Sequence, residues 1–297
     1  MLAVAMAGVG KCAAAQDAVS RGAYLAKAGG CVGCHTEDRR GAAPYAGGRA
    51  LKTPFGTFYG PNITPDPAAG IGRWRERDFV RALREGLAPG GVHLYPAFPY
   101  PSFTRITDAD LKDLWAYLRT VPPSAQPNRA HELRFPFGWR ALIWGWKLMY
   151  FNPGPEPASA GRSAVQARGA YLVDALGHCG ECHTPRNWLG APRMDRYLAG
   201  GRTPEGKDVP NLTPAGLGKW SDADLREFLV TGLTPDGDIA SQAMGEVIRN
   251  TASLKTVTKI ISRKFNCWHH FIQNCFTMEF NGTVPILSVC QYFRTHL

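Results

Sequence analysis

Short runs of apolar residues with helical spacing occur in both halves of the chain, separated by loops rich in Gly and Pro. One run follows Thr107, with Leu111, Leu114, Trp115 and Leu118 at positions i, i+3, i+4 and i+7, which is typical of an amphipathic helix. Thr107 and Asp110 form a capping box at its start. Because strand-like alternation is scarce, the pattern predicts an all-α chain, with about three short helices in each half.

The second half repeats the short motifs of the first half in the same order. R-G-A-Y-L occurs at 21–25 and 168–172, G-G-R at 47–49 and 200–202, and P-N-[IL]-T-P at 61–65 and 210–214. A Trp then precedes a short helical run, and a Gly at a C-cap position ends that run in each half. Repeats over this length predict two domains in tandem, at 16–122 and 161–250, joined by a Pro- and aromatic-rich linker at 123–160.

Length and composition agree with two globular domains. The chain has 297 residues, of which 44% are hydrophobic and 20% charged, which excludes a disordered chain. Its formal net charge is +10, but no basic run or RNA-type aromatic motif accompanies the charge. We therefore expect the charge to guide docking to a protein or lipid partner, and expect no nucleic acid partner.

Four of the eight cysteines lie in two C-x-x-C-H motifs, the attachment signature of c-type haem. In each motif two thiols form thioethers with one porphyrin, and the adjacent His supplies the proximal nitrogen to the iron. A redox dithiol and a zinc site also use C-x-x-C pairs, but the two pairs lie 148 residues apart (179 minus 31) and both are followed by His. The motifs predict two covalent haem c groups, attached at Cys31, Cys34, Cys179 and Cys182, with His35 and His183 as iron ligands.

Covalent haem attachment implies export, and the start of the chain fits a signal peptide. Residues 1–10 are small and apolar, and Ala13–Ala15 before Gln16 fits an A-x-A cleavage site. No Lys or Arg precedes Lys11, so either this signal peptide is atypical or its true start lies upstream. We expect cleavage after residue 15 and a periplasmic protein, with peripheral binding to the inner membrane as an open alternative.

The linker contains an aromatic and apolar segment at 135–151. It is too short to span a bilayer, and Arg140 and Lys147 interrupt it. One interpretation is a helix packed between the domains; the other is an exposed surface for a partner subunit or the membrane interface.

These motifs resemble those of the di- and trihaem cytochrome c subunits of membrane-associated bacterial dehydrogenases, which act on alcohols, gluconate, sugars or aldehydes. The resemblance covers residues 20–250 and rests on R-G-A-Y-L before C-x-x-C-H, on P-N-[IL]-T-P, and on segments 94–100, 177–187 and 244–250. It implies two class I cytochrome c domains. It also implies a non-catalytic subunit that transfers electrons from a dehydrogenase catalytic subunit to quinone or a terminal oxidase.

In such proteins Met usually supplies the sixth iron ligand. Aligning Trp220 with Trp74 gives an offset of 146 (220 minus 74), which places Met244 opposite Phe98. Met244, in a stretch expected to be irregular, is the predicted sixth ligand of haem 2. Phe98 has no lone pair, so haem 1 either takes His93 as its sixth ligand, or His93 is an exposed loop residue and the iron is open. An open haem 1 supports the alternative function of a dihaem peroxidase-like enzyme.

The resemblance also implies roles for three pairs of residues around the haems. The carbonyls of Pro61 and Pro210 accept the N–H of the proximal His. Trp74 and Trp220 donate to haem propionates, and Arg49 and Arg202 pair with propionates. The alternative for each residue is a packing or solvated role.

The amino-acid composition of the chain changes at 251–297. This segment contains one Gly, one Ala and one Pro, whereas the preceding chain is rich in all three. It adds Cys267, Cys275 and Cys290 outside any C-x-x-C-H frame, and Cys267, His269 and His270 form only a weak metal motif. We interpret this tail as a frameshift or insertion that replaces the last helix of the second domain. A truncated, degenerate cytochrome is therefore a further alternative.

Overall fold

The computed structural model describes residues 17–154, 163–251 and 254. The predicted signal peptide, residues 155–160 of the predicted linker, residues 161–162 of the second predicted domain and nearly all of the predicted tail lie outside the described residues. The predictions for those segments, including the weak metal motif at Cys267, are therefore not tested.

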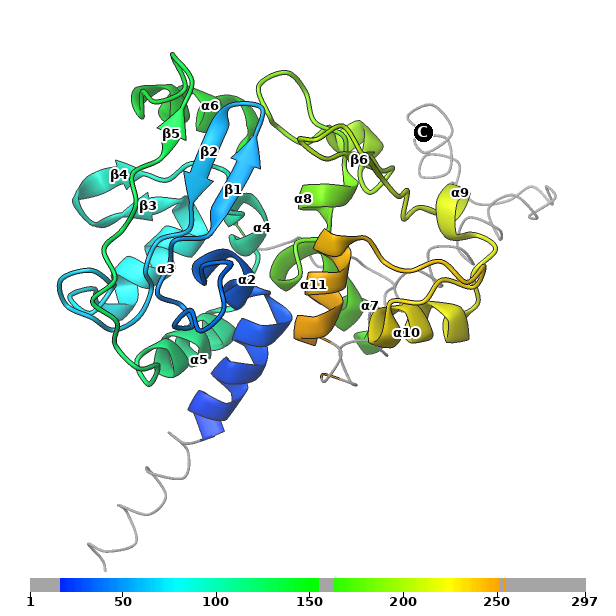
Figure 1. Cartoon of the computed structure of the whole chain (residues 1–297), viewed down its shortest axis with the longest axis horizontal. Helices are drawn as coiled ribbons and strands as arrows, with labels where there is room; N and C mark the ends of the chain where they lie inside the picture. The colour runs from blue at the N-terminus through cyan, green and yellow to red at the C-terminus, as the bar shows by residue number, and fades with distance from the viewer. Residues whose placement is uncertain (1–16, 155–162, 252–253, 255–297) are drawn as a thin grey trace, which may run out of the picture.

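The first half begins with a helix over 17–28 and contains the first haem motif in its second helix (Figure 1). Its elements are α2 (Cys31–His35), β1 (Ala50–Thr53), β2 (Gly56–Tyr59), α3 (Glu76–Glu85), β3 (Leu87–Ala88), the 3-10 turn η1 (Pro89–Gly91), β4 (Val92–His93), α4 (Tyr100–Phe103) and α5 (Asp108–Leu118).

The linker and the second half follow with a similar alternation of short helices and loops. Their elements are β5 (Glu132–Leu133), α6 (Ala141–Tyr150), α7 (Ala164–Ala170), the π-helical η2 (Tyr171–Leu176), α8 (Gly180–His183), the 3-10 turn η3 (Met194–Arg196), β6 (Gly201–Arg202), β7 (Asp208–Val209), α9 (Pro214–Leu217), α10 (Asp222–Thr231) and α11 (Gln242–Thr251). Within the described ranges, no helix is both long and apolar enough to cross a membrane.

Among the described residues, three small antiparallel sheets accompany the helices, so the all-α prediction is only partly right. β1, β2 and β5 form one sheet, β3 pairs with β4, and β6 pairs with β7. These strands have two to four residues, too few to produce a detectable alternation of apolar and polar positions. β5 lies in the predicted linker, so residues beyond 122 extend the sheet of the first half.

Capping side chains and glycines define the ends of these helices. The Thr107 hydroxyl accepts from the Asp110 N–H (3.2 Å) at the start of α5, and Ser221 forms a reciprocal capping box with Asp224 at the start of α10. Gly86 (φ 62°) and Gly232 (φ 81°) end α3 and α10 in the left-handed conformation, which glycine adopts without steric cost.

One hydrophobic core connects the two halves. Leu25 of the first helix and Leu111 and Leu114 of α5 are buried in the same cluster as Leu172 and Leu176 of η2. Cys31 and Val32 of the first haem motif pack against this cluster. The core around the first motif is therefore completed by residues of the second half.

Candidate haem sites

The two haem motifs lie in short helices that bring both thiols to one side. Gly30 (φ 64°) turns the chain from the first helix into α2, so that Cys31 and Cys34, one helical turn apart, share a face. His35 ends the helix. Cys31 and Cys34 are free thiols rather than a disulfide, so both sulfurs can form thioethers.

The proximal histidines have the same partners in both halves. His35 Nδ1 donates to the Pro61 carbonyl (2.7 Å), and His183 Nδ1 donates to the Pro210 carbonyl (2.8 Å). This contact leaves Nε2 of each ring for a metal and fixes the orientation of the imidazole. Burial lowers the pKa of both histidines, opposed by the hydrogen bond to the proline carbonyl, and thereby favours the neutral form that ligates iron.

The G-G-R repeat supplies a second matching contact. The Gly47 N–H donates to the His35 carbonyl (2.8 Å), and the Gly200 N–H donates to the His183 carbonyl (2.9 Å). Gly47 and Gly200 have positive φ values of 81° and 88°, which a residue with a Cβ adopts only with strain. Sequence reasoning found this repeat but missed that its glycines hold the haem histidines.

The repeated arginines pair with carboxylates of the chain. Arg49 is 2.9 Å from Glu246 of α11, whereas Arg202 is largely exposed and lies 3.2 Å from Asp208. The Arg49–Glu246 ion pair joins the two halves. The predicted pairing with haem propionates stays a prediction for both arginines.

The repeated tryptophans have packing contacts. Trp74 packs against the shared core, and Trp220 packs against the cluster of Val173, Leu198 and Leu225. Their donation to propionates is not tested by these contacts.

The distal residues differ from the sequence expectations in their local structure. Met244 lies inside the helix α11, so the prediction of an irregular stretch around it is wrong. The Met244 side chain is half-buried and lies one helical turn before the buried Ile248. Phe98 packs against Phe103 and the shared core. His93 lies in β4 against α6, and its backbone carbonyl accepts a hydrogen bond from Arg140. Burial lowers the pKa of the His93 imidazole, and the positive charge of Lys147 lowers it further. The ligand roles of Met244 and His93 stay predictions.

The two haem motifs are neighbours. Nε2 of the His178 ring donates to the Gly29 carbonyl (3.3 Å), and the ring packs edge-on against Phe103. His178 directly precedes Cys179, and Gly29 lies two residues before Cys31, so this bond connects the starts of the two motifs. Sequence reasoning missed this role, although His178 stands where the first motif has Gly30.

Close to this contact, α11 packs on α2 (Figure 1). A Cβ added at Gly33 would lie 3.2 Å from Glu246 Oε1, so a glycine between the two cysteines of the first motif allows the close approach of α11.

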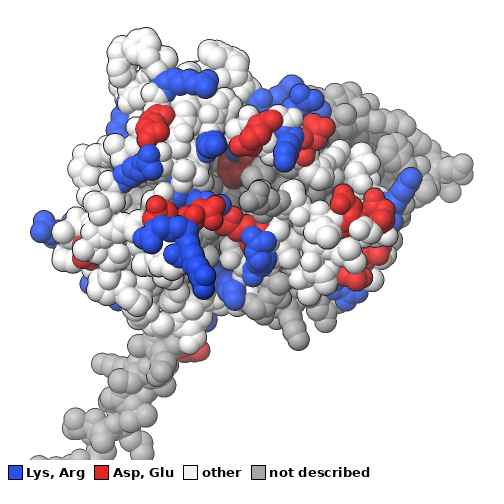
Figure 2. Space-filling model, in the orientation of Figure 1, with Lys and Arg blue, Asp and Glu red and all other residues white. Residues whose placement is uncertain are grey.

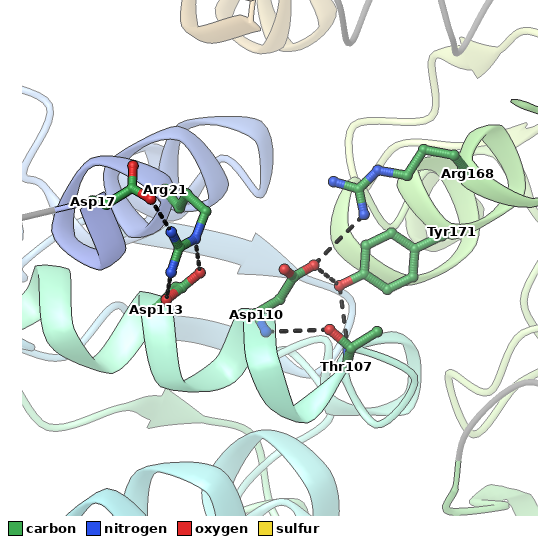
Figure 3. A network of polar contacts seen from close by, with 7 residues as sticks. All are labelled: Asp17, Arg21, Thr107, Asp110, Asp113, Arg168 and Tyr171. Carbon is green, nitrogen blue, oxygen red and sulfur yellow. Dashed lines mark hydrogen bonds and ion pairs between the residues drawn. The ribbon is translucent and has the colours of Figure 1, made fainter. Parts of the chain in front are cut away.

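A polar network joins both R-G-A-Y-L repeats to the same helix, α5 (Figure 3). Arg21 donates to both oxygens of Asp113 (2.6 and 2.9 Å). Arg168 lies 3.6 Å from Asp110, and the Tyr171 hydroxyl donates to Asp110 (2.5 Å). α5 therefore holds the helix before each haem motif.

Segments rich in Cys and His can also bind a metal ion without haem. Across the part of the chain that the structure describes, no group of three or more His, Cys, Asp or Glu side chains could hold one.

Comparison with known proteins supports the same chemistry. Residues 19–122 match the Cytochrome c family model. The chain is 48% identical over 240 residues to a diheme cytochrome c-type protein of Cereibacter sphaeroides, covering 79% of this chain and 80% of that protein.

Cytochrome subunits of dehydrogenases are also similar to this chain. It is 43% identical over 241 residues to the fructose dehydrogenase cytochrome subunit of Gluconobacter japonicus, covering 80% of this chain and 49% of that protein. It is 42% identical over 251 residues to the gluconate 2-dehydrogenase cytochrome c subunit of Pantoea cypripedii, covering 80% of this chain and 56% of that protein. The chain thus spans about half the length of these two relatives. With its two matched haem motifs and this coverage of a dihaem relative, the chain belongs to the family of dihaem c-type cytochromes and cytochrome c subunits of bacterial dehydrogenases.

Proposed function

We propose that this chain carries two covalent haem c groups and transfers single electrons from a dehydrogenase catalytic subunit to quinone or a terminal oxidase. The observation that carries the proposal is the matched pair of contacts from His35 to Pro61 and from His183 to Pro210. Two sites with the same ligand, the same thiol spacing and the same carbonyl partner favour two groups of one kind.

The residues present fit haem c at both sites. Cys31 and Cys34 would hold one group and Cys179 and Cys182 the other, with His35 and His183 as proximal ligands. A bound haem supplies an iron that accepts and releases one electron at a time. The chain orients each imidazole through a proline carbonyl and favours its neutral form, which favours a defined reduction potential.

The chain's role in this proposal is that of a non-catalytic subunit. Its relatives carry the names of cytochrome subunits of fructose, gluconate and alcohol dehydrogenases. A subunit of this kind acts in the periplasm, where the C-x-x-C-H thiols receive haem. We propose the same compartment here, with 16–122 and 161–250 as two class I cytochrome c domains.

Haem stoichiometry tests the proposal most directly. We expect two haems per chain, measured by intact mass and haemochrome absorbance on protein matured in a bacterial periplasm. The double variant Cys179→Ala, Cys182→Ala should keep one haem, and Cys31→Ala, Cys34→Ala should keep the other. One haem in the wild type would reject the dihaem proposal and favour the degenerate cytochrome.

A redox assay separates electron transfer from peroxidase activity. The oxidised protein should accept electrons from a reduced dehydrogenase subunit and return them to a quinone analogue in a potential-dependent manner. Peroxide-dependent oxidation of a reduced donor, at rates above those of free haem, would favour the peroxidase-like alternative instead.

A further inference from the structure

The linker helix α6 has an inverted distribution of polar and apolar side chains. Its one charged residue, Lys147, is buried at 9% exposure, and Nζ donates to the carbonyls of Glu85 (2.6 Å) and Gly86 (2.8 Å) at the end of α3. Ile143 and Trp146 are buried beside it, and Trp146 Nε1 donates to the Leu189 carbonyl (3.0 Å). This face packs between the halves, as the first interpretation of the linker expected.

The opposite face of α6 is apolar and exposed. Trp144 is 58% exposed and Leu148 69% exposed, and Leu142 and Met149 accompany them on the outside. Phe135 (80% exposed) and Trp139 continue the surface before the helix. A soluble surface helix normally places its lysine outside and its Trp and Leu inside, so this arrangement indicates that an apolar partner covers the outer face.

The charged side chains within this segment of the chain have one sign. No Asp or Glu occurs at 133–155, whereas Arg134 and Arg140 are exposed beside the apolar side chains. In Figure 2 the uppermost edge, over β5 and α6 of Figure 1, is mostly uncharged, with Lys or Arg between the uncharged parts and Asp or Glu only below them. The whole chain adds to this field with its net charge of +10.

We propose that the outer surface of residues 135–149, which we call the α6 surface, binds the headgroup region of an anionic lipid bilayer. Trp and Arg side chains around an apolar helix face are typical of helices that lie in the membrane interface. The absence of acidic residues over the whole segment matches the negative charge of such a bilayer. The helix lies on the membrane with Trp144 and Leu148 among the headgroups, and does not cross it. This proposal does not depend on the electron-transfer role.

Vesicle flotation of the full haem-loaded protein tests the proposal. Two vesicle compositions are compared: phosphatidylglycerol with phosphatidylethanolamine, and phosphatidylcholine alone. We expect binding to the anionic vesicles and much weaker binding to the neutral ones. The variant Trp144→Ser, Leu148→Ser should lower the affinity for anionic vesicles about tenfold or more, because two apolar side chains no longer enter the interface.

A matched control removes comparable apolar side chains elsewhere. Val230 and Ile239 are exposed in the second half, so Val230→Ser, Ile239→Ser should bind vesicles as the wild type does. Haem absorbance and thermal unfolding check that each variant is folded; if Trp144→Ser, Leu148→Ser is not, Phe135→Ser, Met149→Ser takes its place.

Two outcomes overturn the proposal. The first is a wild type that does not float with anionic vesicles, and the second is an equal loss of binding in the control variant. In the first case, association with a second copy or with a dehydrogenase subunit that Trp144→Ser, Leu148→Ser abolishes would assign the α6 surface to a protein partner instead.

Discussion

The proximal sides of the two predicted haems are nearly identical, and their distal sides are not. His35 and His183 contact equivalent proline carbonyls, whereas Phe98 occupies the position in the first half that Met244 occupies in the repeat. Sixth ligands strongly affect reduction potential, so we expect two separate potentials. We therefore expect single residues on the distal side to decide which haem is the easier to reduce.

Replacing Met244 tests its predicted role as a ligand. Met244→Leu keeps the volume of the side chain but removes the sulfur, so one midpoint potential should fall by on the order of 100 mV, a fraction of the ~0.8 V that axial ligands span. Redox titration with optical detection measures both potentials. Met194, which is exposed, gives the control Met194→Leu. Two unchanged potentials in Met244→Leu would show that another group ligates haem 2.

His178 makes stability depend on pH in a defined direction. Burial lowers the pKa of His178 below its ordinary 6.5, opposed by the charge of Glu181 and the bond to Gly29. The unfolded chain therefore binds a proton more readily than the folded chain, and the free energy of unfolding should fall as pH drops below 6.5.

The variant His178→Gln keeps a donor for the Gly29 carbonyl but does not titrate. It should lose up to about 1.4 kcal/mol per pH unit of this dependence, because one proton is involved. Denaturant unfolding of the oxidised protein at pH 5 and pH 7 measures the difference. Parallel pH profiles for the wild type and the variant would contradict the prediction.

At the scale of elements, the two glycines that end α3 and α10 in the left-handed conformation can be compared directly. Gly86 and Gly232 end equivalent helices, but a Cβ at Gly86 would lie 2.6 Å from the Tyr100 ring, whereas its nearest neighbour at Gly232 would lie at 3.4 Å. Gly232→Ala should cost about 1–2 kcal/mol for the positive φ alone. Gly86→Ala should cost about 1–3 kcal/mol more, because the Tyr100 ring must move. Chemical denaturation of both variants tests this order, and equal losses would show that Tyr100 yields without cost.

The sequence predicted helices better than strands, and local contacts better than distant ones. α5 and α10 begin at Thr107 and Ser221 because their caps are local and visible in the sequence. β5 pairs with β2, which lies more than 70 residues earlier in the chain. β5 has only two residues, too few for an alternation of apolar and polar positions to be visible in the sequence. Likewise, the contact of His178 with Gly29 depends on how the halves pack, and no spacing in the sequence encodes that packing.

At the scale of the whole molecule, α5 acts as the common support of both halves. Tyr171→Phe removes the hydroxyl that donates to Asp110, and a hydrogen bond to a charged group stabilises by about 1.5–3 kcal/mol. The free energy of unfolding should fall by about that amount. Tyr24→Phe, at the equivalent position of the first repeat, is the control and should cost less. A larger loss in the control than in Tyr171→Phe would contradict a supporting role of Asp110 for the second half.

The shared core also sets an order in time. The first half ends its last helix at Leu118, but the core around Cys31 is complete only when Leu172 and Leu176 have joined it. The 58 residues in between (176 minus 118) must therefore reach the compartment of maturation before this core can close. Until then the Cys31 and Cys34 thiols belong to a chain that has not finished packing, and we expect them to be accessible to the enzymes that attach haem. We expect packing of the second half to end the period in which the first half can be matured.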